Sequence, residues 1–283
     1  MKGKKARKET GRKKSVIPGF GISMGVTITM LSLIVLIPMA SIVICSSGLS
    51  PGEFIRIVSA RDVVSGYFVS FTCALIAALV NCFFGTVLAW VLVRYNFPGK
   101  RIFDGLIELP FALPTAVAGI SLTSLYSDKG WLGSIFAKAG INIAYTRIGI
   151  TIAMVFIGIP FVVRAIQPVL EKLDKQYEEA AAMLGASESR TFFKVILPEI
   201  IPALLTGFGL ALARGIGEYG SVVFIAGNIP YETQIAPLII MTKLEQFKYE
   251  DATAIALVML LASFIILFAI NMIQTHASRL TND

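Results

Sequence analysis

The stretch from Tyr67 to Val93 reads YFVSFTCALIAALVNCFFGTVLAWVLV and contains no charged residue. The hydrocarbon core of a bilayer is about 30 Å thick, and an α-helix rising about 1.5 Å per residue crosses it in roughly 20 residues. The stretch exceeds this length on its own. It therefore predicts a transmembrane helix, and the rest of the chain can be searched for others like it.

The remaining apolar stretches predict five more crossings, so the predicted fold class is an all-α integral membrane protein with six transmembrane helices. One stretch, Ile148–Val163, is short and is expected to continue past Arg164, with this arginine snorkelling to the interface. Another, Ile200–Ala226, is apolar except for Arg214 and Glu218. The other three stretches have no charged residue and are Gly19–Cys45, Leu109–Ser127 and Ala252–Ser278.

The net charge of +7 raises the alternative of nucleic-acid binding. Many of the basic residues, however, lie in segments that share one side of the membrane if residues 1–18 are cytoplasmic. This excess follows the positive-inside rule, so we expect both termini in the cytoplasm and no nucleic-acid partner. The residues concerned are Lys2, Lys4, Lys5, Arg7, Lys8, Arg12, Lys13, Lys14, Arg94, Lys100, Arg101, Lys172, Lys175, Arg190 and Lys194.

The predicted organisation is one membrane domain with polar ends. The first apolar stretch is longer than a signal-peptide core of about 7–15 residues and has no small-x-small cleavage site, so it predicts an uncleaved anchor. Pro51-Gly52 predicts a turn in the outer loop. The predicted segments are a basic cytoplasmic tail (1–18), the first transmembrane helix and outer loop (19–65), a core of five helices (66–275) with a cytoplasmic elbow (171–199), and a cytoplasmic tail (276–283).

Side chains that support catalysis or metal binding are scarce. Cys45, Cys73 and Cys82 lie in apolar stretches, and the only histidine is His276. Cys73 and Cys82 face opposite sides of one predicted helix and so cannot form a disulfide. We expect no catalytic residue and no metal site. A membrane-embedded enzyme is a distant alternative, because it needs carboxylates, histidines or a nucleophile clustered at membrane depth.

Two prolines, Pro110 and Pro114, interrupt the third apolar stretch. Each removes a backbone donor and should bend or break the helix. In a membrane such a break is tolerated where it is packed in protein or lines a cavity. Two interpretations stay open. One is a plain kink; the other is a half-helix whose N-terminus faces a pathway and whose Thr115 and Ser121 hydroxyls meet a passing oxyanion.

Arg214 and Glu218 are four residues apart, so one helical turn brings them together. Charges at membrane depth pair with each other or face a cavity, because burying a lone charge is costly. One interpretation is a structural ion pair that ties helices together. The other is a gate, in which Arg214 contributes positive potential to an anion path and Glu218 balances it.

The segment between the fourth and fifth crossings predicts a helix–turn–helix elbow. Apolar residues at spacings of three and four predict an amphipathic helix that stops at Gly185. Ser187 is a suitable N-cap for a second helix, Glu188–Leu197, which Pro198 follows. The apolar positions of the first helix are Leu170, Leu173, Tyr177, Ala181 and Leu184.

The elbow contains Glu179-Ala180-Ala181, then Gly185 after three residues, and then Val195-Ile196-Leu197-Pro198 after nine more. This pattern resembles the E-A-A-x-x-x-G-(x9)-I-x-L-P signature of ABC-importer permeases. The resemblance implies that the elbow docks in a groove of a cytoplasmic ATPase. Glu179 would make a polar contact there, Ala180 and Ala181 would permit close approach, and Gly185 would form the turn. A passive channel would not need such an elbow.

ATP is expected on another subunit, because the chain has no G-x-x-x-x-G-K-[ST] phosphate loop. We therefore expect no cofactor in this chain, with ATP and Mg bound by a partner ATPase.

Five further segments are similar to the T-type permease subunit of sulfate/thiosulfate importers. The resemblance implies a type I ABC importer fold, like that of molybdate and methionine permeases, in a prokaryotic cell membrane. It also implies a W-type permease subunit in a heterodimer, two ATPase copies, and an external sulfate/thiosulfate-binding protein docked near Asp128–Arg147 and Gly227–Asp251. A molybdate or tungstate permease stays an alternative, because these oxyanions share charge and shape. The segments are Leu109–Gly119, Pro160–Arg164, Gln167–Glu171, Arg214–Gly220 and Phe224–Asn228.

Overall fold

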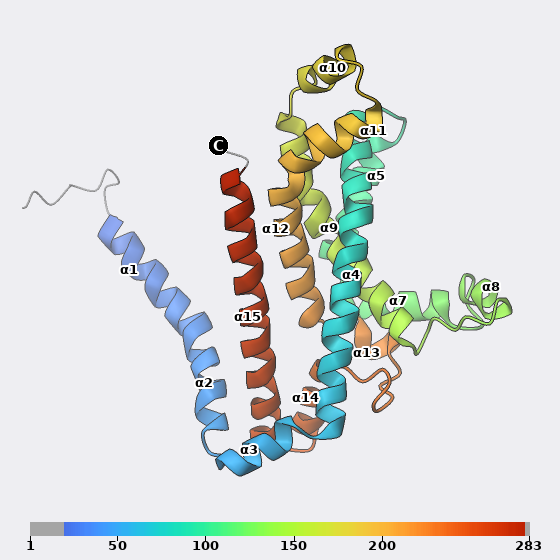
Figure 1. Cartoon of the computed structure of the whole chain (residues 1–283). Coiled ribbons are helices and arrows are strands. Elements are labelled where there is room, and N and C mark those ends of the chain that lie inside the picture. Colours follow the sequence, from blue (N-terminus) through green and yellow to red (C-terminus); the bar gives the residue numbers. More distant parts are fainter. Residues whose placement is uncertain (1–19, 281–283) are drawn as a thin grey trace, which may run out of the picture.

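The computed structural model describes residues 20–280, with side chains as far as Thr275. The predicted tail at 1–18 and the last residues of the tail at 276–283 lie outside this part of the chain. The described residues form helices and loops without any strand (Figure 1). Five of these helices are long and apolar enough to cross a membrane: Phe20–Ser46, Arg61–Arg94, Arg147–Lys172, Glu188–Ile216 and Tyr249–Thr275.

Three helices form the centre of the bundle: α4 (Arg61–Arg94), α9 (Arg147–Lys172) and α12 (Leu197–Ile216). Glycines let their backbones approach closely, as is common between helices in membranes. A Cβ added to Gly85 of α4 would lie 2.8 Å from Cγ1 of Val162 on α9. The three helices therefore pack as one unit with little room for larger side chains.

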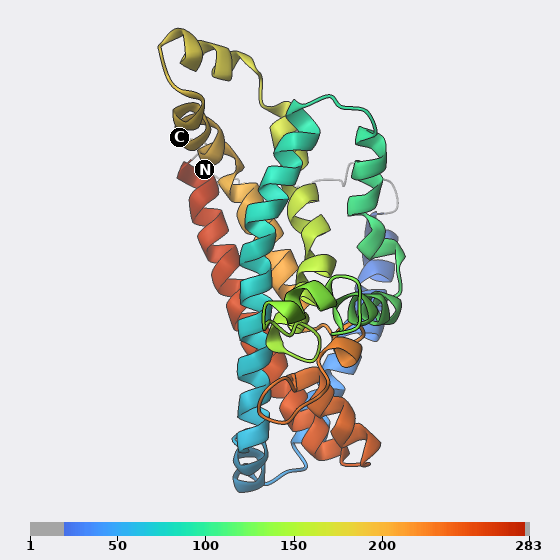
Figure 2. The ribbon, with the colours of Figure 1, turned by 90° about the vertical axis from the view of Figure 1, so that its right-hand side faces the viewer.

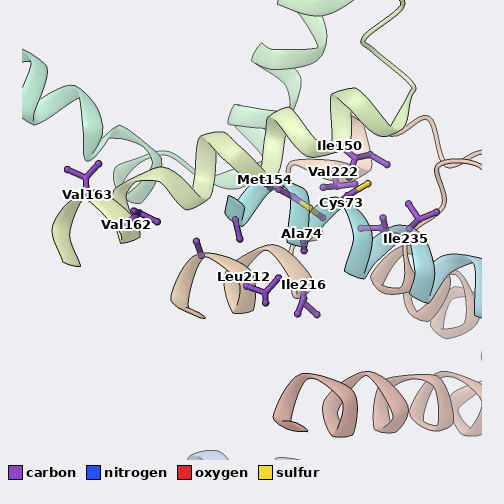
Figure 3. Packing of buried hydrophobic residues seen from close by; sticks show 14 of the residues in the cluster. Cys73, Ala74, Ile150, Met154, Val162, Val163, Leu212, Ile216, Val222 and Ile235 are labelled. Carbon is purple, nitrogen blue, oxygen red and sulfur yellow. The ribbon is translucent and has the colours of Figure 1, made fainter. Parts of the chain in front are cut away.

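The side chains between these helices are aliphatic or contain sulfur. Cys73 of α4, Met154 of α9 and Leu212 of α12 are all buried there (Figure 3). The last helix, α15 (Tyr249–Leu280), packs beside α12 and closes the bundle on one side (Figure 1). Lipid is as apolar as these side chains, so close packing rather than the hydrophobic effect holds the helices together.

The helices α4 and α9 run in the same direction. At one end, Nη2 of Arg94 donates to the carbonyl of Leu173, 3.3 Å away. At the start of α9, the carbonyl oxygen of Arg147 lies 3.8 Å from Sγ of Cys73, which is in the first half of α4. The chain between Arg94 and Arg147 must therefore return along the length of the bundle.

The third apolar stretch is broken near its prolines, as predicted, and forms no helix of spanning length. The return is made by three short helices, α5 (Lys100–Ile107), α6 (Leu109–Ala112) and α7 (Thr115–Tyr126), with Leu113 and Pro114 extended between the last two. Pro114 has no N–H to continue the hydrogen bonds of a helix, and it disfavours helical backbone at Leu113, the residue before it. The part of the chain that the structure describes thus has five helices of spanning length, not six.

The first apolar helix leans away from the bundle. It comprises α1 (Phe20–Leu31), a π-helical turn η1 (Ser32–Leu36) and α2 (Ile37–Ser46). The second half lies beside α15, whereas the first half diverges from it (Figure 1). No residue of α1 is buried. The π turn lies directly before Pro38, where the regular hydrogen-bond ladder is interrupted.

The outer segments are more helical than predicted. Pro51 begins a short helix, α3 (Pro51–Val58), instead of a simple turn, because Ser50 and Glu53 form a capping box around its first turn. Hydrogen bonds from Ser50 hold the pKa of the Glu53 carboxyl below its ordinary value. Five more short helices complete the described part of the chain: α8 (Gly133–Lys138), which projects sideways in Figure 1, α10 (Gln176–Met183), α11 (Glu188–Thr191), α13 (Val222–Ile225) and α14 (Ala236–Glu245).

Candidate functional site

The elbow extends beyond the ends of the long helices, at the end of the bundle where α4 and α9 finish (Figures 1 and 2). Its first arm is α10 (Gln176–Met183) and its second arm is α11. Gly185 has a φ of 77°, a left-handed conformation that favours glycine, and it stops the first arm as predicted. The predicted N-cap is also confirmed, because the Ser187 hydroxyl accepts from the Arg190 amide at 3.4 Å.

The prediction of a single amphipathic helix from Leu170 to Leu184 is wrong. α9 ends at Lys172, Leu173 is extended, and α10 begins only at Gln176. The Asp174 carboxylate accepts from the Gln176 amide at 3.0 Å and so favours the new start. The apolar spacing crosses this break, so its residues share no single face.

The second arm also continues farther than predicted. α11 passes through a π-helical turn, η2 (Phe192–Ile196), directly into α12. In this turn the Leu197 amide donates to the Phe192 carbonyl five residues back, and Pro198 falls in the first turn of α12. Leu197 and Pro198 therefore join the elbow to the long helix rather than separating them.

The tip of the elbow is apolar and uncovered. Met183 and Leu184 are each 89% exposed, and Tyr177 is exposed as well. Glu179 and Ala180 are also exposed, while Ala181 is partly covered. Exposed apolar side chains beside a free carboxylate are typical of a surface that meets another protein.

A cavity of about 640 Å³ lies behind the tip, between α10, α11 and the end of α4. Arg94, the last residue of α4, lines it, and its Nη2 lies 2.6 Å from Oε1 of Glu178. In the sequence, Arg94 is a topology signal and Glu178 is one of several polar residues of the elbow, so neither predicts this pair. The missed ion pair joins residues on distant segments, and no local spacing marks it.

The second candidate site is the end of α12. Arg214 and Glu218 do pair, with Nη1 2.5 Å from Oε2. The helix ends at Ile216, so Glu218 lies just beyond it rather than on it. The side chain of Glu218 is 1% exposed, and its Oε1 accepts from the amide of Ser221 at 2.8 Å and from its hydroxyl at 3.0 Å.

This geometry assigns different roles to the two charges. Glu218 has its carboxylate oxygens occupied by Arg214 and Ser221, so it holds the α12–α13 turn in shape. Arg214 keeps a side chain that is 34% exposed. It has five N–H donors, and its pair with Glu218 does not use all of them. The structural and the path interpretation are therefore compatible.

The broken third segment packs on the same turn. Thr115 begins α7 and lies against Gly220, and Gly119 lies against the backbone of Ser221. The structure thus brings Thr115 beside the turn that contains Glu218. Ser121 is exposed and Pro114 is exposed, whereas Pro110 is buried in α6. Of the path residues predicted on this segment, Thr115 alone has a described contact with the turn after α12.

Arg164, which was predicted to snorkel, forms two ion pairs. Its Nη1 lies 2.7 Å from Oδ1 of Asp104, and its Nη2 lies 2.8 Å from Oε1 of Glu108. Gln167 also accepts from Nη1 at 2.5 Å. Two carboxylates on the α5 side make pairing more favourable than solvent exposure, so Arg164 fixes the start of the broken segment to α9.

Among the described side chains, no three histidines, cysteines or carboxylates lie close enough to hold a metal ion. Cys45, Cys73 and Cys82 are free thiols.

Residues 81–282 match the protein family described as binding-protein-dependent transport system inner membrane component. The chain is 50% identical over 258 residues to the sulfate transport system permease protein CysT of Synechocystis sp., covering 91% of this chain and 90% of that protein. It is 45% identical over 266 residues to the sulfate transport system permease protein CysT of Escherichia coli, covering 94% of this chain and 96% of that protein.

The structure is also similar to a chain in the crystal structure of a bacterial ABC transporter involved in the import of the acidic polysaccharide alginate. The TM-score is 0.74 at 14% identity, covering 91% of this chain and 96% of that chain. At this identity the likeness shows the fold alone.

Proposed function

Since the chain belongs to the family of binding-protein-dependent transport system inner membrane components, we propose that it is the permease subunit of an ATP-driven sulfate importer, with thiosulfate as a second substrate. The names of its relatives support sulfate, because they are 45% and 50% identical over most of the chain. The observation that carries the permease role is the exposed elbow with Glu179 beside Met183 and Leu184.

The elbow is proposed to dock in a groove of the ATPase. Met183 and Leu184 at its tip would be covered there, and burying apolar surface of this size favours association. Glu179 would pair with a basic group of the ATPase, and Ala180 and Ala181 would allow close approach. Gly185 sets the angle between the arms, and Leu197 and Pro198 connect the second arm to α12.

We infer six crossings, with the broken segment α5–α7 acting as the third. The parallel course of α4 and α9 supports this, because two parallel crossings need one return between them. The basic residues near the elbow favour a cytoplasmic location for that end of the bundle. With six crossings, both termini would then be cytoplasmic as well. The binding protein would then meet the opposite end, near Asp128–Arg147 and Gly227–Asp251.

The proposed assembly is a heterodimer with a W-type permease subunit, together with two ATPase subunits that bind ATP and Mg. Closure of the ATPases on ATP would draw the two elbows together and rock the helices to alternate access. Arg214 would offer its free N–H donors to the anion, and Thr115 its hydroxyl, while Glu218 holds the turn. An unpaired Glu218 would repel a dianion, so Glu218 has to stay paired with Arg214.

A molybdate or tungstate permease is the alternative, since these anions share the charge and shape of sulfate. The test is ATP hydrolysis by the purified complex, co-expressed with its partners, when the binding protein is loaded with sulfate or with molybdate. We expect stimulation by sulfate alone. Stimulation by molybdate alone would overturn the sulfate assignment and keep the permease role.

The same assay tests the elbow. Glu179→Lys should abolish stimulation, because it places a positive charge where a negative one is proposed to pair. The matched control is Glu199→Lys at the start of α12, where the glutamate is exposed and lies outside the elbow arms. Equal activity of the two variants would contradict the role of Glu179.

A further inference from the structure

The end of α4 is attached to the first arm of the elbow. Arg94 is the last residue of this helix, and its side chain is only 9% exposed. It pairs with Glu178 of α10 at 2.6 Å and donates to the Leu173 carbonyl at 3.3 Å. Leu173 lies in the non-helical linker before α10. Arg94 therefore contacts both the linker between α9 and α10 and the first arm that follows it.

The same helix end also contacts the second arm. The guanidinium of Arg94 lies 5.5 Å from the centre of the Trp90 ring, in cation–π geometry. The Trp90 ring in turn meets the Phe192 ring edge to face at 5.5 Å. Phe192 begins the π turn that joins α11 to α12. Both arms of the elbow are thus attached to one helix end.

The opposite end of α4 is attached to the loop between α13 and α14. The guanidinium of Arg61 lies 5.5 Å from the ring centre of Tyr231, and the Ser65 hydroxyl donates to the Tyr231 carbonyl at 3.0 Å. Farther along, the Ala236 amide donates to the Ser70 hydroxyl at 2.9 Å, and this pair is buried. These contacts fix residues 231–236 to α4.

The helix between these two ends is unbroken. α4 has 34 residues, which corresponds to about 50 Å at about 1.5 Å per residue. α9 also reaches both ends, since Arg147 donates to the Glu232 carbonyl at 2.7 Å. Its connection to α10, however, passes through the extended Leu173, which transmits a sideways movement poorly. The contacts of Arg94 bypass this linker.

We propose that Arg94 is a positioning residue that makes the elbow and α4 move as one body, and that α4 carries this movement to residues 231–236 on the other side of the membrane. The proposal deepens the proposed function, because it rests on the elbow being the ATPase contact. An external loop would in this way respond to the state of the ATPases.

The test is hydrogen exchange of the assembled transporter, with and without ATP plus vanadate to trap the ATPases closed. In the wild type, the exchange rates of the amides of residues 231–236 should change about tenfold on trapping, within the range typical of coupled sites. In Arg94→Ala this change should disappear, and exchange in α10 should become faster. Arg101→Ala, an exposed arginine on α5, is the matched control and should behave as the wild type.

Two further variants keep the result interpretable. Glu178→Gln retains the size of the side chain and removes its charge. It should also abolish the exchange response of residues 231–236 to trapping, and it replaces Arg94→Ala if that variant fails to assemble. In a double-mutant cycle, the effects of Arg94→Ala and Glu178→Ala on the exchange response of residues 231–236 should be strongly non-additive, because both substitutions remove the same ion pair. Unchanged exchange in α12 reports that the fold is intact.

Two results would overturn the proposal. A wild type whose residues 231–236 do not respond to trapping would rule out transmission along α4. An equal response in the wild type and in Arg94→Ala would rule out Arg94 as the attachment. The trapping mixture contains ATP and vanadate but no sulfate, so a failure of sulfate to stimulate ATP hydrolysis would refute the proposed substrate without deciding this test.

Discussion

Among the described residues, Glu218 is the charged residue with the most buried side chain. Its carboxylate accepts two hydrogen bonds from Ser221 and pairs with Arg214. A carboxylate in apolar surroundings is stable only when its oxygens are occupied in this way. The turn between α12 and α13 is therefore held together by one side chain, and Arg214 gains its position from it.

We expect Glu218→Gln to reduce uptake at least about tenfold while the protein still inserts in the membrane. The amide keeps the shape but loses the charge that balances Arg214, and losing a charged hydrogen-bond partner costs about 1–3 kcal/mol. Uptake by vesicles and the amount of inserted protein are the two measurements. Wild-type uptake in this variant would leave Glu218 with a structural role only.

Thr115→Val is expected to lower uptake several-fold, because it keeps the shape against Gly220 and removes the proposed hydroxyl contact with the anion. Thr115→Ser retains the hydroxyl and is the matched control. Initial uptake rates at limiting sulfate compare the two. Unchanged uptake in Thr115→Val would remove this residue from the path.

At the scale of elements, glycines determine where helices stop and how closely they pack. Gly185 stops α10 with a left-handed backbone, and Gly119 lets α7 lie on the turn after α12. The two glycines serve different physical needs, one conformational and one steric. Substitutions at them should therefore fail for different reasons.

Gly185→Val should release the ATPase from the complex. A β-branched residue in the left-handed region is strained by roughly 1–2 kcal/mol, so the arms of the elbow would change their angle. Gly105→Ala is the control, because Gly105 lies within α5 and a Cβ there has open space. Co-purification of the ATPase with each variant is the measurement, and equal recovery would contradict the prediction.

Gly119→Ala should lower the thermal stability of the purified protein. An added Cβ would overlap the backbone of Ser221, which cannot move aside as a flexible side chain does, and such overpacking costs about 1–3 kcal/mol. Gly25→Ala in α1 has open space around it and should have no such effect. If both variants melt alike, α7 does not depend on this contact.

Elements were predicted well where the signal is local and poorly where it is not. Pro114 correctly predicted an interruption, and Gly185 and Ser187 correctly marked the turn of the elbow, since these are properties of a few adjacent residues. The helix across Leu170–Leu184 was predicted wrongly. Its apolar spacing continues past Leu173, but the Asp174 carboxylate starts a new helix there.

At the scale of the whole molecule, the course of the chain can be tested by labelling. In a variant without its native cysteines, Lys138→Cys on α8 should react with an impermeant maleimide added to right-side-out vesicles, whereas Arg101→Cys at the start of α5 should react only after permeabilisation. Both positions are exposed. Labelling of both from one side would show that α5–α7 does not cross the membrane.

The apolar stretches, the direction of insertion and the elbow signature are readable in the chain itself. Each depends on helix length, on charge next to a helix or on a short spacing, and the membrane acts on these directly. The family resemblance rests on the same short patterns.

Which charges pair was decided by the tertiary structure. Arg164 contacts Asp104 across 60 positions of the chain, and Arg94 contacts Leu173 across 79. Both arginines looked like interfacial charges, and their partners become visible only once the helices are packed. The role of a charged side chain near a membrane depends on the groups that packing brings next to it. An unpaired charge is costly there, because it loses its contact with water. The position of α7 has the same origin, since the turn after α12 supplies the surface on which α7 rests.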